Sequence, residues 1–152
     1  MRVSARVDYA VRALVQLAAD DSTVPVKAEH LATSQQIPPK FLLEILRQLK
    51  QKKLLVSRRG PEGGYVLARP ASEISIADVI RAVEGPLATV RDVSPAHLTY
   101  DGPTESLMTV WVAVRGSLRQ VLETVSLEDV RTGRLPRHVV TTAEKYGVDE
   151  RP

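Results

Sequence analysis

Apolar residues that recur at steps of three and four positions predict three helices within the first 51 residues. The first helix is capped by Ser4 and ends near Asp20, and the second begins at about Lys27 and ends near Ser34. The third covers 38–51 and follows a turn of only three residues, a spacing typical of a helix-turn-helix. The inward faces comprise Val3, Val7, Ala10, Val11, Leu14, Leu17 and Ala18 of the first helix, Ala28, Leu31 and Ala32 of the second, and Phe41, Leu42, Ile45, Leu46 and Leu49 of the third.

Two short apolar runs after the third helix predict a β-hairpin. The runs 54–56 and 65–67 flank a turn that is longer than the tightest two-residue connections. The turn contains Gly60, Pro61, Gly63 and Gly64. A helix-turn-helix followed by such a hairpin is the layout of a winged helix-turn-helix. We therefore expect a mainly α fold with a small β-hairpin wing.

A fourth, shorter helix and a linker are expected after the hairpin. Ser75 is the expected N-cap of this helix, Asp78 completes a capping box, and Gly85 ends the helix. The composition then loosens, which predicts a linker without regular structure. The expected regions are a DNA-binding domain over 1–85, a linker or effector region over 86–103, a dimerisation helix over 104–132 and a flexible tail over 133–152.

A long amphipathic helix is expected from about Thr104 to Thr124. Its apolar stripe lies outside the winged unit and needs a partner surface, so we expect dimerisation through this helix. The stripe comprises Leu107, Val110, Trp111, Val114, Leu118, Val121, Leu122 and Val125. Ser126 with Asp129 indicates a capping box for a short terminal turn, and the polar tail beyond Gly133 is expected to be frayed.

The charge distribution indicates which part of the chain binds a polyanion. The formal net charge is only +3, but residues 1–85 hold 13 basic and 9 acidic residues, whereas 86–152 hold 8 and 9. Between Lys40 and Arg59 there are seven basic residues and one acid, Glu44. A charge run is most often a solvated surface. Here the charge, the helix and the glycine-rich hairpin all favour DNA binding.

Candidate DNA contacts lie at the start of the third helix and at the base of the hairpin. Lys40 is expected to reach base edges or phosphates. Arg58 and Arg59 either enter a narrow minor groove and hold phosphates, or are exposed strand-end charges. Leu43 either points outward, where it could touch a thymine methyl, or belongs to the core. The candidate set is Arg2, Arg6, Lys27, Gln35, Gln36, Pro38, Lys40, Arg47, Arg58, Arg59, Gly60, Gly63 and Gly64.

Composition excludes several other classes of protein. The chain has 152 residues and no cysteine, so disulfides, thiol catalysis and cysteine-ligated metal or cluster sites are excluded. No apolar run approaches the roughly 20 residues of a membrane span and no signal peptide opens the chain, so we expect a cytoplasmic protein. No nucleophile–base pair is recognisable, and we expect neither an enzyme nor a cofactor.

A metal site is disfavoured by the same reading. His97 with Asp101 and Glu105 could bind a metal together with Asp8 of a partner, but a surface histidine is the simpler interpretation. No metal is therefore expected.

Four stretches resemble the bacterial IscR/NsrR/CymR family of dimeric winged helix-turn-helix transcription regulators. They are Tyr-Ala-Val-Arg-Ala-Leu at 9–14, Ile-Pro-Pro-Lys-Phe-Leu at 37–42, Arg-Gly-Pro-Glu-Gly-Gly-Tyr at 59–65, and the stretch from 74 to 85. The resemblance extends from the first residue to about Leu127, and the wing motif is specific.

The resemblance implies a crossed dimer built from the first and the long helices, with the third helix in the major groove and the wing at the minor groove. Many members hold an iron–sulfur cluster through three cysteines in the loop before the long helix. This sequence departs there, because 85–104 contains no cysteine, and Asp8, at the position of a non-cysteine ligand in some members, would have no ligand partners. Members without the cysteines sense other signals or rely on a protein partner.

We therefore expect a homodimeric regulator, a repressor, that binds an inverted repeat in double-stranded DNA and responds to a small-molecule or protein effector. The alternative is a winged-helix adaptor that binds protein and has lost DNA binding. The excess of six positive charges between Lys40 and Arg59 argues against it. An enzyme that uses the glycine-rich turn is third, and stabilisation by nucleotides would reveal it.

Overall fold

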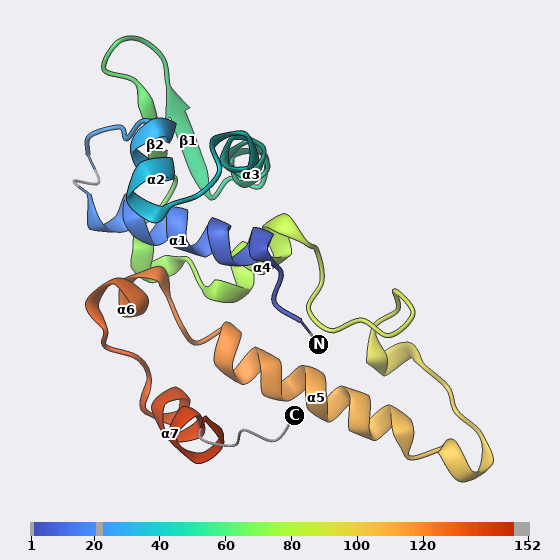
Figure 1. The fold of residues 1–152 in the computed structure, drawn as a ribbon. Helices are drawn as coiled ribbons and strands as arrows, with labels where there is room; N and C mark the ends of the chain where they lie inside the picture. Colours follow the sequence, from blue (N-terminus) through green and yellow to red (C-terminus); the bar gives the residue numbers. More distant parts are fainter. Residues whose placement is uncertain (1, 21–22, 148–152) are drawn as a thin grey trace.

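Short helices pack around one apolar core, and a two-stranded hairpin extends from it, as the computed structural model shows for residues 2–20 and 23–147 (Figure 1). The helices are α1 (Ala5–Ala19), α2 (Ala28–Gln35), α3 (Pro39–Gln51), α4 (Ile76–Val83), α5 (Leu107–Leu122), α6 (Leu127–Thr132) and α7 (Arg137–Tyr146). The strands are β1 (Leu55–Arg58) and β2 (Gly64–Leu67), and 3-10 turns lie at Ala71–Glu73, Pro95–His97 and Gly102–Thr104. The expected mainly α winged fold is confirmed.

The first three helices form at the expected positions. The Val7 amide donates a hydrogen bond of 3.2 Å to Oγ of Ser4, the expected N-cap of α1. Between α2 and α3 the chain reverses at Gln36, whose φ of 53° is left-handed, and the Ile37 amide bonds to the Ala32 carbonyl at 2.9 Å. Leu14, Leu31, Leu42, Ile45, Leu46 and Leu49 form the centre of the core.

Two residues expected to face inward do not. Val3 is 68% exposed because it precedes α1 and lies at an open cavity that residues of α4 and α5 also line. Phe41 is 46% exposed and lies at the edge of the α1–α3 contact, where its ring meets Tyr9 edge-on at a centroid distance of 5.8 Å. The aromatic contact therefore places Phe41 beside the core instead of within it.

The hairpin is antiparallel and is fastened to the helical part. Its register runs from Leu55 opposite Leu67 to Arg58 opposite Gly64. Val26, just before α2, exchanges two backbone hydrogen bonds with Tyr65, of 2.9 and 2.8 Å. The base of the wing is therefore held in a fixed relation to α2.

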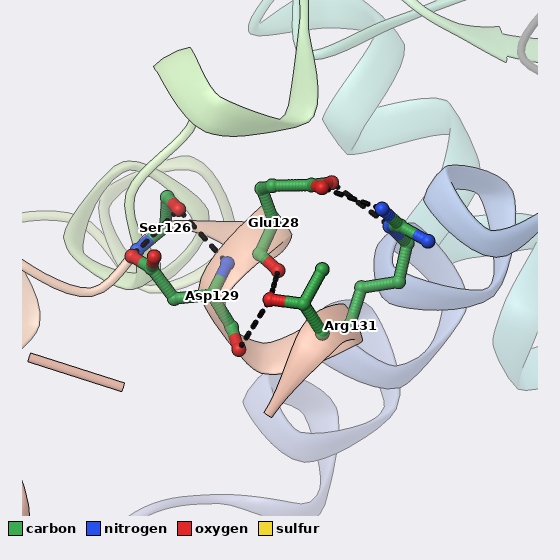
Figure 2. Close-up of polar contacts among 5 residues, drawn as sticks. Ser126, Glu128, Asp129 and Arg131 are labelled. Carbon is green, nitrogen blue, oxygen red and sulfur yellow. Dashed lines mark hydrogen bonds and ion pairs between the residues drawn. The ribbon is translucent and has the colours of Figure 1, made fainter. Parts of the chain in front are cut away.

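The segment after α5 returns to the core of the N-terminal helices. Ser75 and Ser126 each cap a helix through the expected capping boxes with Asp78 and Asp129, and Figure 2 shows the second of these. The Ile76 amide donates to the Val125 carbonyl and the Leu127 amide to the Ile74 carbonyl, both at 2.9 Å. Leu127 is fully buried against the core and α6 packs on α1, so the N-terminal core depends on a residue from the far end of the chain.

The expected linker has little regular structure, and the long helix lies beside the core, not within it (Figure 1). Over 86–103 the chain forms 3-10 turns and buries Leu87, Pro95 and Leu98. The α5 helix begins three residues later than expected and contains no buried residue.

The tail beyond Gly133 was expected to be frayed, and this prediction was wrong for Arg137–Tyr146, which form α7. Pro136 immediately precedes the helix, a position where its fixed backbone angle is compatible with a helix start. The His138 Nε2 atom lies 2.9 Å from the Gln120 carbonyl and 3.0 Å from Oγ1 of Thr124, which fastens α7 to the end of α5. The remainder of the expected tail, 148–152, lies outside the described residues. Over 2–20 and 23–147, no helix is long and apolar enough to cross a membrane.

Candidate nucleic-acid interface

The outward face of α3 is an accessible surface of the helix-turn-helix. Its exposed side chains are Lys40, Leu43, Glu44, Arg47 and Gln51. They repeat at helical spacing opposite the buried leucine and isoleucine side chains of α3, so they share one face. Leu43 is 52% exposed, so it points outward and does not belong to the core.

The only acid of this face, Glu44, is paired with two arginines. Arg47 Nη2 and Nε donate to its two carboxylate oxygens at 2.7 and 3.0 Å. Arg6 of α1 brings its Nη2 atom to 3.7 Å from the same carboxylate. The hydrogen bonds from Arg47 lower the pKa of Glu44 below its ordinary value and outweigh its partial desolvation. The carboxylate therefore stays ionised, and neither arginine is a free surface charge.

The hairpin presents two exposed basic residues, Arg58 and Arg59, at the end of β1. Gly60 has a φ of 103°, which side chains rarely adopt, and its carbonyl accepts the Gly63 amide at 2.9 Å. A Cβ atom on Gly63 would lie 2.3 Å from the Arg58 carbonyl oxygen. A Cβ atom on Gly64 would lie 2.4 Å from the Val26 carbonyl oxygen. Close packing within the chain thus accounts for Gly63 and Gly64.

Gln35 is used inside the protein. Its side-chain Nε2 donates to Oε1 of Gln16 at 2.8 Å, and its backbone carbonyl accepts from the Arg12 guanidinium. Arg12 also bonds to Asp8 at 3.1 Å and lies over the Tyr9 ring at 5.5 Å. This cluster joins α1 to the end of α2, and the sequence alone did not indicate it. The Gln35 side chain is therefore not free to contact DNA.

The remaining candidates occupy different parts of the surface. Gln36, Pro38 and Lys27 are exposed around the two helix starts of the helix-turn-helix. Arg2 instead lines a cavity of about 250 Å³ between α1, α4 and α5, together with Leu118. The structure therefore gathers most of the candidates on the α2–α3 and wing side but leaves Arg2 apart from them.

The apolar stripe of α5 divides into two parts. Val110 and Val114 are 49% and 42% exposed. Trp111, Leu118 and Leu122 are half-buried, and the last two line the cavity beside α4. The other stripe residues on α5, Leu107 and Val121, are half-buried. Val125 lies beyond α5 and is only 6% exposed within the protomer, so it does not belong to the exposed stripe.

A helix-turn-helix with a basic hairpin behind its second helix defines a winged helix-turn-helix protein of the DNA-binding class. The chain belongs to the Rrf2 family, described as iron-dependent transcriptional regulators, whose model matches residues 3–132. The resemblance to IscR and CymR regulators is thereby confirmed, and the chain is a transcriptional regulator.

Relatives agree with this assignment. A Mycobacterium tuberculosis H37Rv protein that carries the provisional name of a helix-turn-helix transcriptional regulator is 53% identical over 150 residues, covering 99% of this chain and 93% of the relative. The solved structure of CymR, the global cysteine regulator of Bacillus subtilis, has a TM-score of 0.74 at 25% identity and covers 87% of this chain and 97% of that one. IscR of T. potens has a TM-score of 0.71 at 29% identity and covers 88% of each chain.

The residues of this chain do not fit the iron site that the family description implies. There is no cysteine in the sequence, so no thiolate can hold iron. The Asp8 carboxylate already accepts a hydrogen bond from Arg12 at 3.1 Å. Within the part of the chain that the structure describes, no three histidine or acidic side chains come together as metal ligands. A cysteine-held cluster is therefore not compatible with this donor set.

Proposed function

We propose that this regulator is a homodimeric repressor that binds an inverted repeat with α3 in the major groove and the wing at the minor groove. The observation that carries the proposal is the exposed face of α3, a helix that contacts β1, the strand that ends at Arg58. The core side chains lie on the opposite face of α3, so DNA could approach without disturbing the fold.

Within this proposal the contacts have different tasks. Lys40, at the second residue of α3, approaches phosphates or base edges together with the amide groups of the helix start. Leu43 offers an apolar contact to a thymine methyl. Arg58 and Arg59 enter the minor groove or bind its phosphates. Lys27, Gln36, Pro38 and Gly60 complete the contact surface.

Dimerisation is proposed to use α5. An exposed apolar stripe on a solvent-facing helix is expected to be covered by a partner, and Val110 and Val114 remain accessible in the protomer. An isologous pair of α5 helices would relate two copies of α3 by a two-fold axis, and the operator would mirror that axis. A small-molecule or protein effector would act through 86–103 or the cavity beside Leu118, because both adjoin α5 and the DNA-binding unit. We place this regulator in the cytoplasm, with its DNA.

The first test is the salt dependence of duplex binding. A dimer that neutralises about 6–10 phosphates should show a slope of about −5 to −9 in log affinity against log salt concentration. An affinity without salt dependence would contradict the proposal and favour the protein-binding adaptor. Arg59→Ala should weaken binding and should do so more strongly on A·T-rich flanks, where the minor groove is narrow. Lys145→Ala is the matched control, because α7 lies at the opposite end of the protomer from the wing (Figure 1).

A further inference from the structure

Glu44 is an unusual residue for a surface that binds phosphates. It is the only acid between Lys40 and Arg59, and it lies on the outward face of α3. A carboxylate at that position repels the DNA backbone unless a cation compensates it. Two cations do so here, Arg47 from the same helix and Arg6 from α1.

The pairing leaves part of the Arg47 guanidinium available. Its Nε and one Nη2 hydrogen are directed to Glu44, in the side-on fork geometry that planar guanidinium and carboxylate groups prefer. An arginine has five N–H donors, so the Nη1 amino group and the second Nη2 hydrogen remain. Two adjacent donors of this kind match the O6 and N7 acceptors of guanine in the major groove.

The same pairing restrains both arginines. An unpaired arginine on a DNA-facing helix has many rotamers and can turn to the nearest phosphate, and such a contact carries no sequence information. Arg6 is held in addition by its place between α1 and α3, where its Nε is buried without a hydrogen-bond partner among the described residues. Within 2–20 and 23–147, the Glu44 carboxylate is the acidic group with which both guanidinium groups pair.

We propose that Glu44 is a positioning residue for sequence specificity, which directs Arg47 toward a guanine and keeps Arg47 and Arg6 from binding phosphates indiscriminately. The inference rests on the proposed function, since it presupposes that α3 enters a major groove. In this inference an acidic residue contributes to the specificity of DNA recognition.

The variant Glu44→Gln tests this proposal, because it keeps the size of the side chain and removes the charge that holds the arginines. The probes are a duplex selected from a random pool by the unaltered protein and a scrambled duplex of equal length. Affinity for the scrambled duplex should rise, and the ratio of the two affinities should fall by about tenfold, within the range of one bidentate base contact. The salt slope should steepen by about 2–4, since up to four arginines per dimer become free to bind phosphates.

Glu62→Gln is the matched control. Glu62 is an exposed acid in the wing turn, and no ion pair is formed by it in the part of the chain described here. It removes the same charge from the same domain without releasing an arginine. An equal change in both variants would show a general charge effect and would overturn the inference.

Replacing single guanines of the selected duplex by 7-deazaguanine removes the N7 acceptor and locates the contact. The unaltered protein should lose about tenfold in affinity at one guanine per half-site, and Glu44→Gln should lose clearly less there. Arg47→Ala should also be insensitive at that guanine, and adding Glu44→Gln to it should reduce discrimination no further. A guanine effect that survives in Arg47→Ala would overturn the inference even if Glu44→Gln folded poorly. Salt-independent binding by the unaltered protein would instead overturn the proposed function.

Discussion

Replacement of Val114 by glutamate is the sharpest test of the proposed dimer. Val114 is 42% exposed in the protomer and lies on the accessible part of the α5 stripe. Leu118 is a less suitable position, because it also lines the cavity beside α1 and α4, so a charge there would disturb the protomer itself. Glutamate is a good helix former, so α5 should persist in the variant.

The expected loss can be worked from this exposure. Full burial of a valine side chain stabilises by about 1.5–3 kcal/mol, so burying the remaining two-fifths on both chains contributes roughly 1.3–2.5 kcal/mol. Two like charges placed across the same two-fold axis add a desolvation cost of several kcal/mol per ion. A total of about 4 kcal/mol or more corresponds to a dissociation constant raised by roughly a thousandfold.

Sedimentation equilibrium over a range of protein concentrations measures this constant, and circular dichroism confirms that the helices are retained. Thr109→Glu is the matched control, because Thr109 is exposed on another side of α5. A Val114→Glu protein that dimerises as tightly as the control would refute the placement of the interface on this stripe.

Three further outcomes are expected. Because the sequence contains no cysteine, the protein purified without air should be colourless, and nitric oxide or iron chelation should leave its DNA affinity unchanged. A brown preparation with stoichiometric iron and sulfide would contradict this prediction. Leu127→Ala should lower the free energy of unfolding by about 2–5 kcal/mol in urea titrations, whereas the 38% exposed Val130→Ala should cost much less. Hydrogen bonds from the Ser126 backbone amide and hydroxyl lower the pKa of Asp129, so the Asp129 carboxylate stabilises the fold at neutral pH and this stabilisation is lost when acid protonates the carboxylate. The variant Asp129→Asn should lack this part of the acid-induced loss of stability. An unchanged dependence of the unfolding free energy on pH would contradict the assignment.

Local patterns in the sequence were sufficient for most of the helical elements and for the wing. Apolar residues at helical spacing locate α1 and α3, because a buried helix face imposes its period on the chain. Ser75 and Ser126 mark the starts of α4 and α6, because a hydroxyl followed by an acid three residues later satisfies the free amides of a first turn. The glycines of the hairpin turn are recognisable because few other residues adopt a φ such as the 103° of Gly60.

The contacts between distant segments required the tertiary structure. Three contacts join residues that are 19 or more positions apart: the packing of Leu127 in the core, the hydrogen bond from Gln35 to Gln16, and the ion pair of Arg6 with Glu44. No local sequence pattern encodes such pairs. The pairing of Glu44 with Arg47 is the exception, since the two stand three residues apart on one helix and could have been inferred from the sequence. By itself the sequence determined most of the elements, with α7 as the exception, and where positive charge collects. The packing of α1 against α2, α3 and α6 decided which of the other polar side chains are paired and which remain free for DNA. These pairs join residues that are distant in the sequence, and they form only when the helices pack together.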